Sequence, residues 1–506
     1  MTHAASVHAT TPDGLLLVLA VMLPVCAVLA ILAGGPRLAA RIALGALAAG
    51  LAVAIAIAAR LMIREAALTY VVGGWSPPLG IALRADGLSV AMLLMTALVV
   101  TAVGLFAFLQ QGLDGASREG RGPATFWMML LGLWSALNLA FVGEDLFNLY
   151  VALELLTFAA VPLVCLDGRA GTLAAALRYL MFALLGSLLY LLGTGLLYGQ
   201  AGTLDLLALS RLGRQDPAIC IALALMILGL LAKAALFPLH LWLPPAHAGA
   251  PAPASAVLSA LVIKAPVFLI LRLVLDVAPS QVARPAGQFL AVLGAASILF
   301  CSVLALRQAR LKLMIAYSTV AQIGYLFIVF PLAFGGEGAA WTTIAWTGGA
   351  LQVVSHALAK AAMFLAAGVI VEAYGHDRIA DLGGFGRALP LTAAAFVLAG
   401  LSLVGIPPSG GFIAKCLLLS ASVIEGHPGL ALTILAGGLL AGGYVFRVVD
   451  RALATGPLPP KRAVPRRLEL PALALAIAAV LLGFVPLRPF WFLQIGREGL
   501  IAAVMP

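Results

Sequence analysis

The sequence predicts an all-α polytopic membrane protein with about 14 transmembrane helices, two of them broken, and two observations lead to this class. Hydrophobic residues make up 63% of the 506 residues and charged residues only 10%. The mean hydropathy is +1.11, far above that of water-soluble domains. Apolar windows of roughly 20 residues, long enough to cross the hydrocarbon core, also recur along the whole chain. They leave few residues for a soluble domain.

The first apolar run begins near Leu15, after a polar segment that contains no Lys or Arg. Because no convincing small-residue cleavage site follows, we expect a retained membrane helix rather than a removed signal peptide. The predicted spans are approximately Gly14 to Ala33, Ala39 to Ala59, Leu88 to Leu109, Thr125 to Val142, Leu146 to Leu166, Leu177 to Tyr198, Ile219 to Phe237, Ala254 to Val274, Phe289 to Leu306, Lys312 to Phe334, Thr342 to Val371, Pro390 to Leu419, Leu430 to Val449 and Leu470 to Leu487.

Two of the predicted spans contain prolines that must interrupt the helix. The seventh runs into FPLHLWLPPAHAGAPAP, with Pro238, Pro244 and Pro245, and the twelfth contains GIPPSGGF, with Pro407 and Pro408. Proline removes an amide donor and clashes one turn back. Broken backbone at membrane depth is tolerated only where protein or a wet cavity satisfies the freed groups. Broken segments in corresponding halves of a transporter point to an ion path.

The spacing of the two breaks predicts two five-helix repeats, spans four to eight and spans nine to thirteen. An odd number of helices per repeat makes the two halves inverted in topology. The chain is therefore expected to divide into N-terminal helices 1–3 (residues 1–124), a first repeat (125–275), a second repeat (286–450), and a basic loop with the last helix (451–506).

The formal charge of +10 is better explained by membrane topology than by a nucleic-acid partner, and no nucleic acid is expected. Arg and Lys divide unevenly between alternate loops: the richer set includes Arg169, Arg310 and Arg466, and the poorer set includes Arg60 and Arg84. Basic loops favour the cytoplasmic side. This predicts a multi-pass protein of a bacterial inner membrane, with both termini on the periplasmic side.

Four of the six lysines lie inside stretches apolar enough to cross a bilayer: Lys233, Lys264, Lys360 and Lys415. A charge of opposite sign, Glu154, lies in DLFNLYVALELLTFAAVPLVCL. An ammonium group at the membrane centre costs at least a few kcal/mol, so such residues normally face a protein interior or a wet cavity and mark an ion or proton route. Lysine suits this task because, unlike arginine, it can release its proton. The set predicts the functional core of a proton-conducting membrane protein.

Glu154 and Lys233 are expected to form a pair across two helices. Burial disfavours the charged form of either side chain, and a nearby opposite charge restores it. The pair would hold the lysine protonated, and its separation would favour release of the proton. The alternative is a static ion pair that only holds two helices together.

Further ionisable groups would extend this route. Lys264 and Lys360 fit relay positions between the two halves, and His356 shares a helix face with Lys360 because the two are four residues apart. Lys415, seven residues after Pro408, begins the second part of the broken twelfth span and would be the site on the outlet side.

Histidines and neutral polar residues leave two interpretations open. His240 and His247, beside the first break, titrate near neutrality and fit either a proton relay or a cap for broken backbone. A group of hydroxyl and amide side chains at helical spacing fits either a chain of waters or interhelical hydrogen bonds. This group consists of Tyr317, Ser318, Thr319, Gln322 and Tyr325.

Several other chemistries lack their sequence signals. The chain contains no P-loop, and GGFGRA at 383–388 follows no strand, so it is no dinucleotide fingerprint. The five cysteines are scattered singly, without C-x-x-C spacing or clustered histidines. We therefore expect no cofactor, no metal site and no redox or hydrolytic site in this chain.

Five segments between residues 80 and 450 carry a family resemblance: FNLYVALELLTF, LAKAALFPLHLWLPPAHAGAPAPASAVLSALVIKAPVF, RLKLMIAYSTVAQIGY, SHALAKAAMF and GIPPSGGFIAK. Together they resemble the antiporter-like proton-translocating membrane subunits. That family includes the large membrane subunits of respiratory complex I, of membrane-bound hydrogenases and of Mrp-type cation/proton antiporters. The segment FPLHLWLPPAHAGAPAPASA is similar to the complex I and hydrogenase members, and GGWSPPLGIALRADGLS is similar to the Mrp D-type subunits.

The resemblance implies roles for the buried residues. Glu154 and Lys233 match the family's coupling pair, Lys264, His356 and Lys360 match its central hydrophilic axis, and Lys415 matches its terminal site. The implied protein is a subunit that moves protons inside a larger complex, with other membrane subunits and the lipid bilayer as partners.

Three alternatives remain for the coupling. In the first, electron transfer in an attached NADH:quinone oxidoreductase-like or hydrogenase-like arm drives proton pumping. In the second, proton uptake drives export of Na⁺ or another monovalent cation, as in a Mrp D-type subunit. In the third, the chain is a membrane scaffold for a redox or inorganic-carbon-handling partner.

Overall fold

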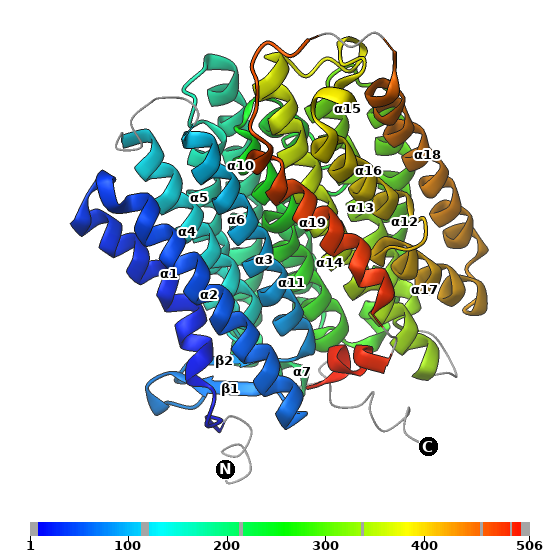
Figure 1. Cartoon of the computed structure of the whole chain (residues 1–506). Helices are drawn as coiled ribbons and strands as arrows, with labels where there is room; N and C mark the ends of the chain where they lie inside the picture. The colour runs from blue at the N-terminus through cyan, green and yellow to red at the C-terminus, as the bar shows by residue number, and fades with distance from the viewer. Residues whose placement is uncertain are drawn as a thin grey trace.

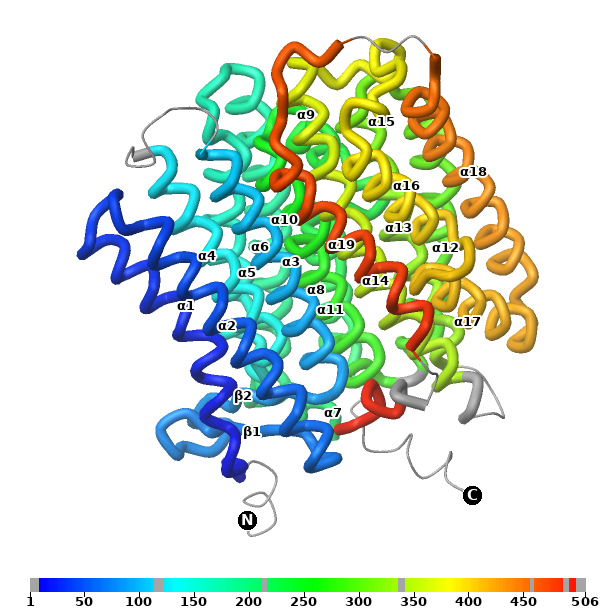
Figure 2. Tube along the Cα trace, in the orientation of Figure 1, coloured from blue at the N-terminus to red at the C-terminus, as the bar shows by residue number. Residues whose placement is uncertain are grey.

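The computed structural model of the chain describes residues 9–112, 121–211, 216–334, 339–455, 459–485 and 488–496. They form one bundle of long helices that run between two ends of the molecule (Figure 1, Figure 2). Twelve helices of the described part are long and apolar enough to cross a membrane, and three shorter apolar helices accompany them. The predicted class, a helical polytopic membrane protein, is confirmed, while the number of 14 spans stays a prediction.

The N-terminal half contains the first helices and a small β-hairpin that the sequence analysis did not predict. Strands β1 (Leu68–Val71) and β2 (Ala82–Ala85) pair antiparallel and lie at the end of the bundle where α1 begins (Figure 1). The helices of this half are α1 (Leu15–Gly34), α2 (Pro36–Arg64), α3 (Gly87–Gln111), α4 (Arg121–Val142), α5 (Leu146–Val164), α6 (Ala170–Ala201), α7 (Leu206–Ser210), α8 (Pro217–Lys233), α9 (Leu243–Gly249), α10 (Ala252–Val257) and α11 (Lys264–Arg272).

The C-terminal half continues the bundle and ends near the hairpin. Its last described turn, the 3₁₀-helix Arg488–Gln494, lies at the same end of the molecule as the start of α1 (Figure 1). The helices of this half are α12 (Ser280–Arg307), α13 (Leu311–Leu332), α14 (Ala339–Tyr374), α15 (Phe385–Ala388), α16 (Pro390–Val404), α17 (Gly410–Ile424), α18 (Pro428–Leu453) and α19 (Leu470–Leu481).

Both predicted interruptions are present at the prolines. Helix α8 ends at Lys233 and α9 begins at Leu243, and α16 ends at Val404 before α17 begins at Gly410. In each case the chain leaves the α-helix inside an apolar stretch because proline cannot donate to the helical ladder. The two breaks place backbone polar groups among buried side chains.

A third irregularity lies in the eighth predicted span. Between α10 and α11 the chain forms a π-helical segment, Leu258–Val262, and α11 is followed by another, Leu273–Val277. Single turns of π-helix are frequent at functional sites. The first of these segments ends two residues before Lys264.

Glycines allow close contacts between helices in each half. A methyl group on Gly186 of α6 would meet the carbonyl oxygen of Gly229 on α8 at 2.5 Å, and one on Gly294 of α12 would meet that of Gly324 on α13 at 2.6 Å. Small residues let backbones approach where lipid supplies no hydrophobic drive between helices. The contact of α6 with α8 brings α6 beside Lys233.

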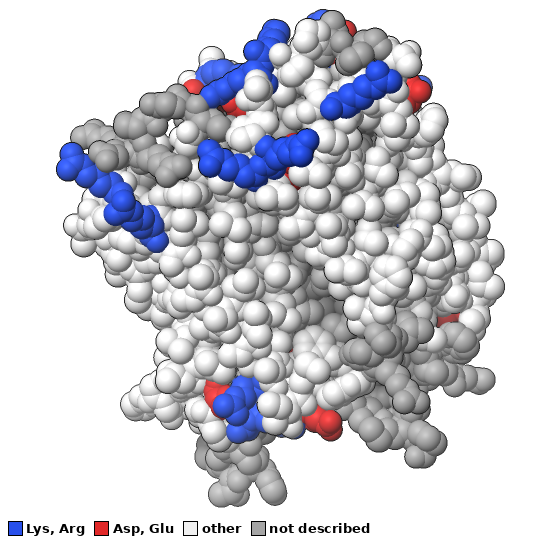
Figure 3. Space-filling model, viewed as in Figure 1, with Lys and Arg blue, Asp and Glu red and all other residues white. Residues whose placement is uncertain are grey.

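Charged residues gather at the two ends of the bundle, and the wall between them is apolar. Figure 3 shows most of the visible Lys and Arg at the end where α15 lies and fewer at the end with the hairpin. Large apolar side chains such as Leu188 on α6 and Phe158 on α5 are exposed on the wall. This distribution is typical of a membrane protein that spans the bilayer from one charged end to the other.

Candidate functional site

The first ionisable pair lies where α5 meets the end of α8. Lys233 is the last residue of α8, and its Nζ donates to Glu154 Oε1 at 3.2 Å and to Thr157 Oγ1 at 3.2 Å. The hydroxyl of Ser187 on α6 also donates to the Glu154 carboxylate. Only 6% of the Lys233 side chain and 15% of the Glu154 side chain are exposed. The structure therefore brings the two predicted partners together among hydroxyl groups.

An aromatic pair holds the break that follows Lys233. The Trp242 indole stacks on Tyr179, with ring centroids 4.3 Å apart, and its Nε1 donates to the Ala232 carbonyl at 2.9 Å. A buried carbonyl near the end of a helix needs such a donor. Lys233 is thus attached to an anchored turn rather than to a loose loop.

The two histidines of the break have different surroundings. His240 interacts with the backbone of Pro238, whereas neither ring nitrogen of His247 has a hydrogen-bond partner in the described part of the chain. The His247 ring is fully buried and stacks on Phe364 of α14, with centroids 4.8 Å apart. His240 Nδ1 also has no hydrogen-bond partner among the described residues, so the choice between a relay and a capping role stays a prediction for both histidines.

The second contact joins Lys264 and His356. Lys264 Nζ lies 2.5 Å from His356 Nδ1, and both residues are buried. One hydrogen is shared between the two nitrogens, donated by the ammonium or by the ring. His356 Nε2 has no hydrogen-bond partner among the described residues, so one ring nitrogen stays available for a second proton contact.

Lys360 lies one turn after His356 on α14 and is fully buried. Its Nζ donates to the Ile315 carbonyl at 3.1 Å and to the hydroxyl of Ser318, both on α13. Within the described residues no carboxylate forms an ion pair with Lys264, Lys360 or Lys415. Neutral oxygen and nitrogen acceptors take the place of a counter-charge at all three.

Lys415 occupies the second break. Its Nζ donates to the carbonyls of Leu403 and Val404 at 2.5 and 3.1 Å, and it lies 4.5 Å from the centroid of the Tyr325 ring. Gly405 ends α16 with φ +88°, and a Cβ there would lie 2.8 Å from the Cδ of Lys415. The glycine therefore leaves the space through which the lysine reaches the last carbonyls of α16.

Two glutamines connect helix α14, which carries His356 and Lys360, with the Leu403 carbonyl beside Lys415. Gln352 Nε2 donates to Gln322 Oε1 at 3.1 Å, and Gln322 Nε2 donates to the Leu403 carbonyl at 3.2 Å, which also accepts from Lys415. The sequence analysis named Gln322 but missed Gln352. The signal that could have found it is its position one turn before His356.

A second charged cluster, at the hairpin end, was not singled out in the sequence. Arg272 Nη2 contacts Asp86 Oδ2 at 2.6 Å, and its Nη1 contacts Asp276 Oδ2 at 3.2 Å. Arg84 Nη1 lies 3.7 Å from Glu144 Oε1. These residues lie far apart in the sequence, with Asp86 directly before α3, Glu144 just before α5 and Arg272 at the end of α11, and the fold brings them together.

The two buried carboxyl groups of this cluster differ in their titration. Burial raises the pKa of Glu144 to about 7, which the charges of Arg84 and Arg272 oppose only in part. Burial alone would also raise the pKa of Asp86. The guanidinium groups of Arg272 and Arg84 outweigh this effect and hold the pKa of Asp86 below its usual range. Glu144 is therefore a group at this end that changes charge near neutral pH.

The sequence matches a known family over much of its length. Residues 143–441 match the family described as "NADH:quinone oxidoreductase/Mrp antiporter, TM". The chain is 38% identical to "NADH-quinone oxidoreductase subunit N" of Desulforudis audaxviator, over 87% of this chain and 88% of that protein. It is 30% identical to the D component of the Na(+)/H(+) antiporter of Bacillus subtilis, over 76% of each protein.

Solved structures resemble the fold over nearly the whole chain. A chain of the Mrp complex from Dietzia sp. DQ12-45-1b superimposes with a TM-score of 0.86 at 25% identity, and the likeness covers 96% of both chains. A chain of respiratory complex I from Thermus thermophilus superimposes with a TM-score of 0.74 at 25% identity, covering 94% of this chain and 98% of that one.

Proposed function

This chain belongs to the family of transmembrane subunits shared by NADH:quinone oxidoreductases and Mrp antiporters, and from this premise we propose that it moves protons through the membrane along a row of buried side chains. The observation that carries the proposal is the placement of four ammonium groups at membrane depth on protein acceptors rather than in lipid. Burying charges for packing alone brings no gain in stability. The proposed row consists of Glu154, Lys233, Lys264, His356, Lys360 and Lys415, with His240 and His247 beside it.

The Glu154–Lys233 pair is the coupling end of the row. With the carboxylate 3.2 Å away, the ammonium form of the lysine is stabilised. When the pair separates, the lysine loses this stabilisation and passes its proton on. Because Lys233 is the last residue of α8, its side chain can turn away from Glu154 while the backbone of the helix stays in place.

The remaining groups carry the proton across the bundle. Lys264 and His356 already share a hydrogen at 2.5 Å, and Lys360 lies one turn further along α14. The Gln352–Gln322 bridge then leads toward Lys415 at the second break. Amides cannot release a proton at neutral pH, so this last step needs water molecules held by the glutamines.

Membrane orientation is part of the same proposal. Lys and Arg concentrate at the end of the bundle near α15 (Figure 3), which supports placing that end in the cytoplasm. The start of α1 and the 3₁₀-helix Arg488–Gln494 lie at the opposite end (Figure 1), which supports periplasmic termini in a bacterial inner membrane. The terminal residues 1–8 and 497–506 lie outside the described residues. The two breaks support a division into two inverted five-helix repeats, residues 125–275 and 286–450, flanked by residues 1–124 and 451–506.

Other membrane subunits are the partners of this chain, because the relatives it matches are components of multisubunit complexes. The first two couplings stay open: redox-driven pumping fits the NADH-quinone oxidoreductase relative, and Na⁺ exchange fits the antiporter relative. A comparison of proton movement in membrane vesicles energised by an electron donor, or by a Na⁺ gradient alone, distinguishes them. The scaffold alternative predicts proton movement in neither experiment.

Lys233→Ala tests the proposal directly. We expect the intact complex to assemble and its coupled proton movement to be lost, because the carboxylate of Glu154 then has no proton carrier beside it. The measurement is proton uptake in vesicles that contain the whole complex, reported by a pH-sensitive dye. Assembly is checked on a native gel.

The matched control is Lys461→Ala, which removes an exposed lysine from a loop. It should leave both assembly and transport unchanged. Full transport by an assembled Lys233→Ala complex would contradict the assigned row.

A further inference from the structure

Helix α11 carries an ionisable group at each end. Lys264, at its start, belongs to the proposed row, whereas Arg272, at its end, belongs to the charged cluster near the hairpin. The helix is nine residues long and lies between the π-helical segments Leu258–Val262 and Leu273–Val277, so regular α-helix is interrupted on both sides. The apolar core of the span Ala252–Val277 is completely buried. The position of α11 in the bundle therefore depends on the contacts of its two ends.

One face of α11 presents a line of three side chains, because residues four apart lie above one another on a helix. Lys264 Nζ lies 2.5 Å from His356 Nδ1 on α14. One turn later, the Phe268 ring packs edge-on against Phe141 of α4, with ring centroids 5.3 Å apart. After a further turn, the Arg272 guanidinium lies 5.0 Å from the centroid of the Phe268 ring. A shift of α11 at the Arg272 end is therefore passed on to Lys264.

Arg272 contacts two carboxylates that are anchored in different places. Its Nη2 lies 2.6 Å from Asp86 Oδ2 and donates to the Ser89 hydroxyl at 3.2 Å, and both partners belong to the start of α3. Asp86 is itself held there, because its Oδ1 accepts from the Ser89 amide at 2.9 Å. The other carboxylate, Asp276, lies 3.2 Å from Nη1 but is only four residues further along the same segment. Of these two carboxylates, only Asp86 ties the end of α11 to another helix.

The helices that receive the two ends of α11 also contact each other. A methyl group on Gly368 of α14 would meet the Phe106 ring of α3 at 3.4 Å. The helix that carries His356 therefore packs directly against the helix that Asp86 caps. The two ends of α11 are thus attached to one framework, and a change in either attachment displaces α11 relative to it.

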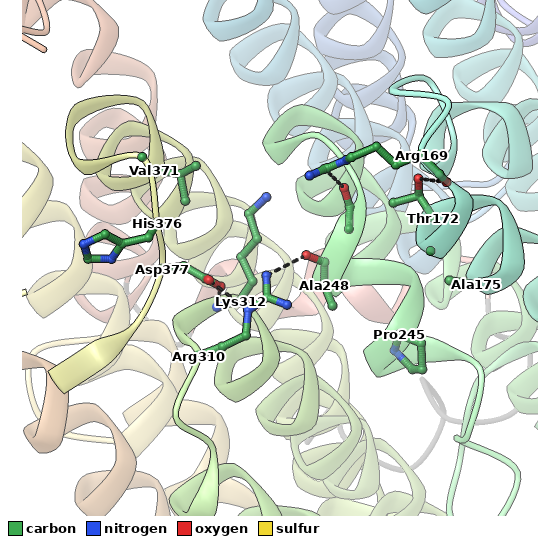
Figure 4. A pocket seen from close by; sticks show the side chains of 13 residues that line it. Arg169, Thr172, Ala175, Pro245, Ala248, Arg310, Lys312, Val371, His376 and Asp377 are labelled. Carbon is green, nitrogen blue, oxygen red and sulfur yellow. Dashed lines mark hydrogen bonds and ion pairs between the residues drawn. The ribbon is translucent and has the colours of Figure 1, made fainter. Parts of the chain in front are cut away.

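Burial distinguishes this attachment from an Arg–Asp pair at the opposite end of the molecule. Arg310 Nε donates to Asp377 Oδ1 at 2.9 Å beside a hollow of about 660 Å³ (Figure 4), and 46% of the Arg310 side chain is exposed. The exposed fractions are 9% for Arg272 and 2% for Asp86. Exposed pairs hold little in place, whereas a buried charge that loses its partner is left uncompensated. Removal of the Asp86 charge is therefore expected to displace Arg272 toward Asp276 or water.

We propose that Arg272 is a positioning residue for proton transfer: its contact with Asp86 sets the axial position of α11, so that Lys264 meets His356 Nδ1. This inference rests on the proposed function and adds what holds one transfer step in register. Arg272 does not carry the proton itself, because arginine does not release one. The step moves one proton between the lysine nitrogen and the ring nitrogen, with no other bond made or broken. A displacement of about 1 Å at such a contact lowers the rate by up to about 100-fold.

Two variants that each remove one carboxylate from Arg272 test the proposal in the whole complex. Asp86→Asn keeps the N-cap of α3, since asparagine caps as well as aspartate, and should lower proton translocation about tenfold. Asp276→Asn is the matched control and should translocate at the parent rate, because Asp276 moves together with α11. Dye-monitored proton uptake in vesicles measures the rates, and a native gel checks assembly. Equal rates for the two assembled variants would overturn the proposal.

Substitutions of Arg272 give a second measurement, which also decides the question if Asp86→Asn does not assemble. Arg272→Gln should translocate about tenfold more slowly than the parent, and Arg272→Lys about threefold more slowly. The lysine keeps the charge but not the planar fork that contacts Asp86 and Ser89. An assembled Arg272→Gln complex at the parent rate would overturn the proposal, as would an Arg272→Lys complex no faster than Arg272→Gln.

A double variant separates positioning from a general loss of structure. If Arg272 acts through the Lys264–His356 contact, Asp86→Asn should lower the rate much less in a His356→Gln chain than in the parent chain. A purely structural role would lower both rates by the same factor, and that result would contradict the proposal. If Asp86→Asn and Arg272→Gln translocate at the parent rate while Lys233→Ala does not, the row stands without this positioning residue. If Lys233→Ala also translocates at the parent rate, the row itself is wrong.

Discussion

Lys233 and Lys415 both lie at helix breaks, but the protein stabilises their ammonium groups in different ways. Lys233 precedes its break and contacts a carboxylate on another helix, Glu154, at 3.2 Å. Lys415 follows its break and contacts the last carbonyls of α16, the half-helix just before it in the chain. One lysine is held by a side-chain carboxylate and the other by backbone carbonyl groups.

In the proposed proton route, this difference would let two similar breaks serve different steps. Movement of α5 relative to α8 would separate the Glu154–Lys233 pair and remove its electrostatic stabilisation in one step. If α16 moves, the two carbonyl groups that Lys415 contacts move with it, because both belong to the backbone of α16. The first break is thus suited to switching and the second to holding or releasing a proton at a constant site.

The largest expected effect comes from removing the carboxylate of the first break. Glu154→Gln keeps the shape of the side chain but leaves Lys233 without a counter-charge, so we expect proton translocation to fall about 100-fold. Dye-monitored proton uptake in vesicles measures it. Glu65→Gln, at an exposed residue, is the matched control, and equal rates for both variants would mean that the pair is a static structural contact.

At the second break, no substitution removes the backbone carbonyls that Lys415 contacts. A substitution can, however, block the space through which Lys415 reaches them. Gly405→Ala places a methyl group 2.8 Å from the Cδ of Lys415 at a residue with φ +88°. We expect about 1 kcal/mol of destabilisation from the left-handed backbone and a fall in translocation of about tenfold. Thermal unfolding and vesicle assays measure the two effects.

Gly426→Ala is the control for backbone strain. Gly426 also has a positive φ, +72°, but an added Cβ meets nothing within 4 Å. The Gly426→Ala variant should be destabilised by about as much as Gly405→Ala, but it should translocate protons at the parent rate. A similar loss of transport in both variants would attribute the effect to strain alone and not to Lys415.

A smaller effect is expected at the aromatic ring beside Lys415. Tyr325→Phe keeps the ring face 4.5 Å from the ammonium, whereas Tyr325→Leu removes it. We expect the leucine variant to translocate about threefold to tenfold more slowly than the phenylalanine variant, as for loss of a cation–π contact. Equal rates would show that the carbonyls alone hold the lysine.

The smallest effect concerns stability at the hairpin end, which lies apart from both breaks. The pKa of Glu144 is raised from 4.5 to about 7, so the folded state binds this proton more tightly than the unfolded state. The free energy of unfolding therefore falls as the pH rises from about 4.5 to about 7. Glu144→Gln should remove this dependence and be more stable than the parent at pH 8, by on the order of 1 kcal/mol.

Thermal unfolding of the purified complex at pH 5 and pH 8 measures the difference, with Glu65→Gln as the control. A variant that is equally destabilised at both pH values would show that the carboxylate of Glu144 stays ionised throughout. Transport should be unaffected because Glu144 lies outside the proposed row.

Much of the architecture was accessible from the sequence because its signals are local. Long apolar runs predict spans, and the prolines at 238 and 407–408 predict breaks, since proline acts on the ladder of its own helix. The π-helical segment before Lys264 was missed although it has a local signal: Pro266 lies four residues after Val262, the last residue of that segment, and cannot donate to its carbonyl.

The site was predictable as a set of residues but not as a set of contacts. An ionisable side chain in an apolar run is conspicuous, so Lys264, His356 and Lys360 could be named. The 2.5 Å contact between the first two needs the fold, because 92 residues separate them. The burial of Lys312 was not predicted, because at the end of a span a buried lysine and a loop lysine look alike in sequence.

The Trp242 indole, stacked on Tyr179 and bonded to the carbonyl next to Lys233, gives the first break a built-in optical reporter. Tryptophan emission depends on hydrogen bonding and ring contacts, so any displacement of that turn changes the fluorescence of this one side chain. In a chain in which Trp242 is the sole tryptophan, the fluorescence would therefore report movement of the turn beside Lys233, in real time and without an attached dye.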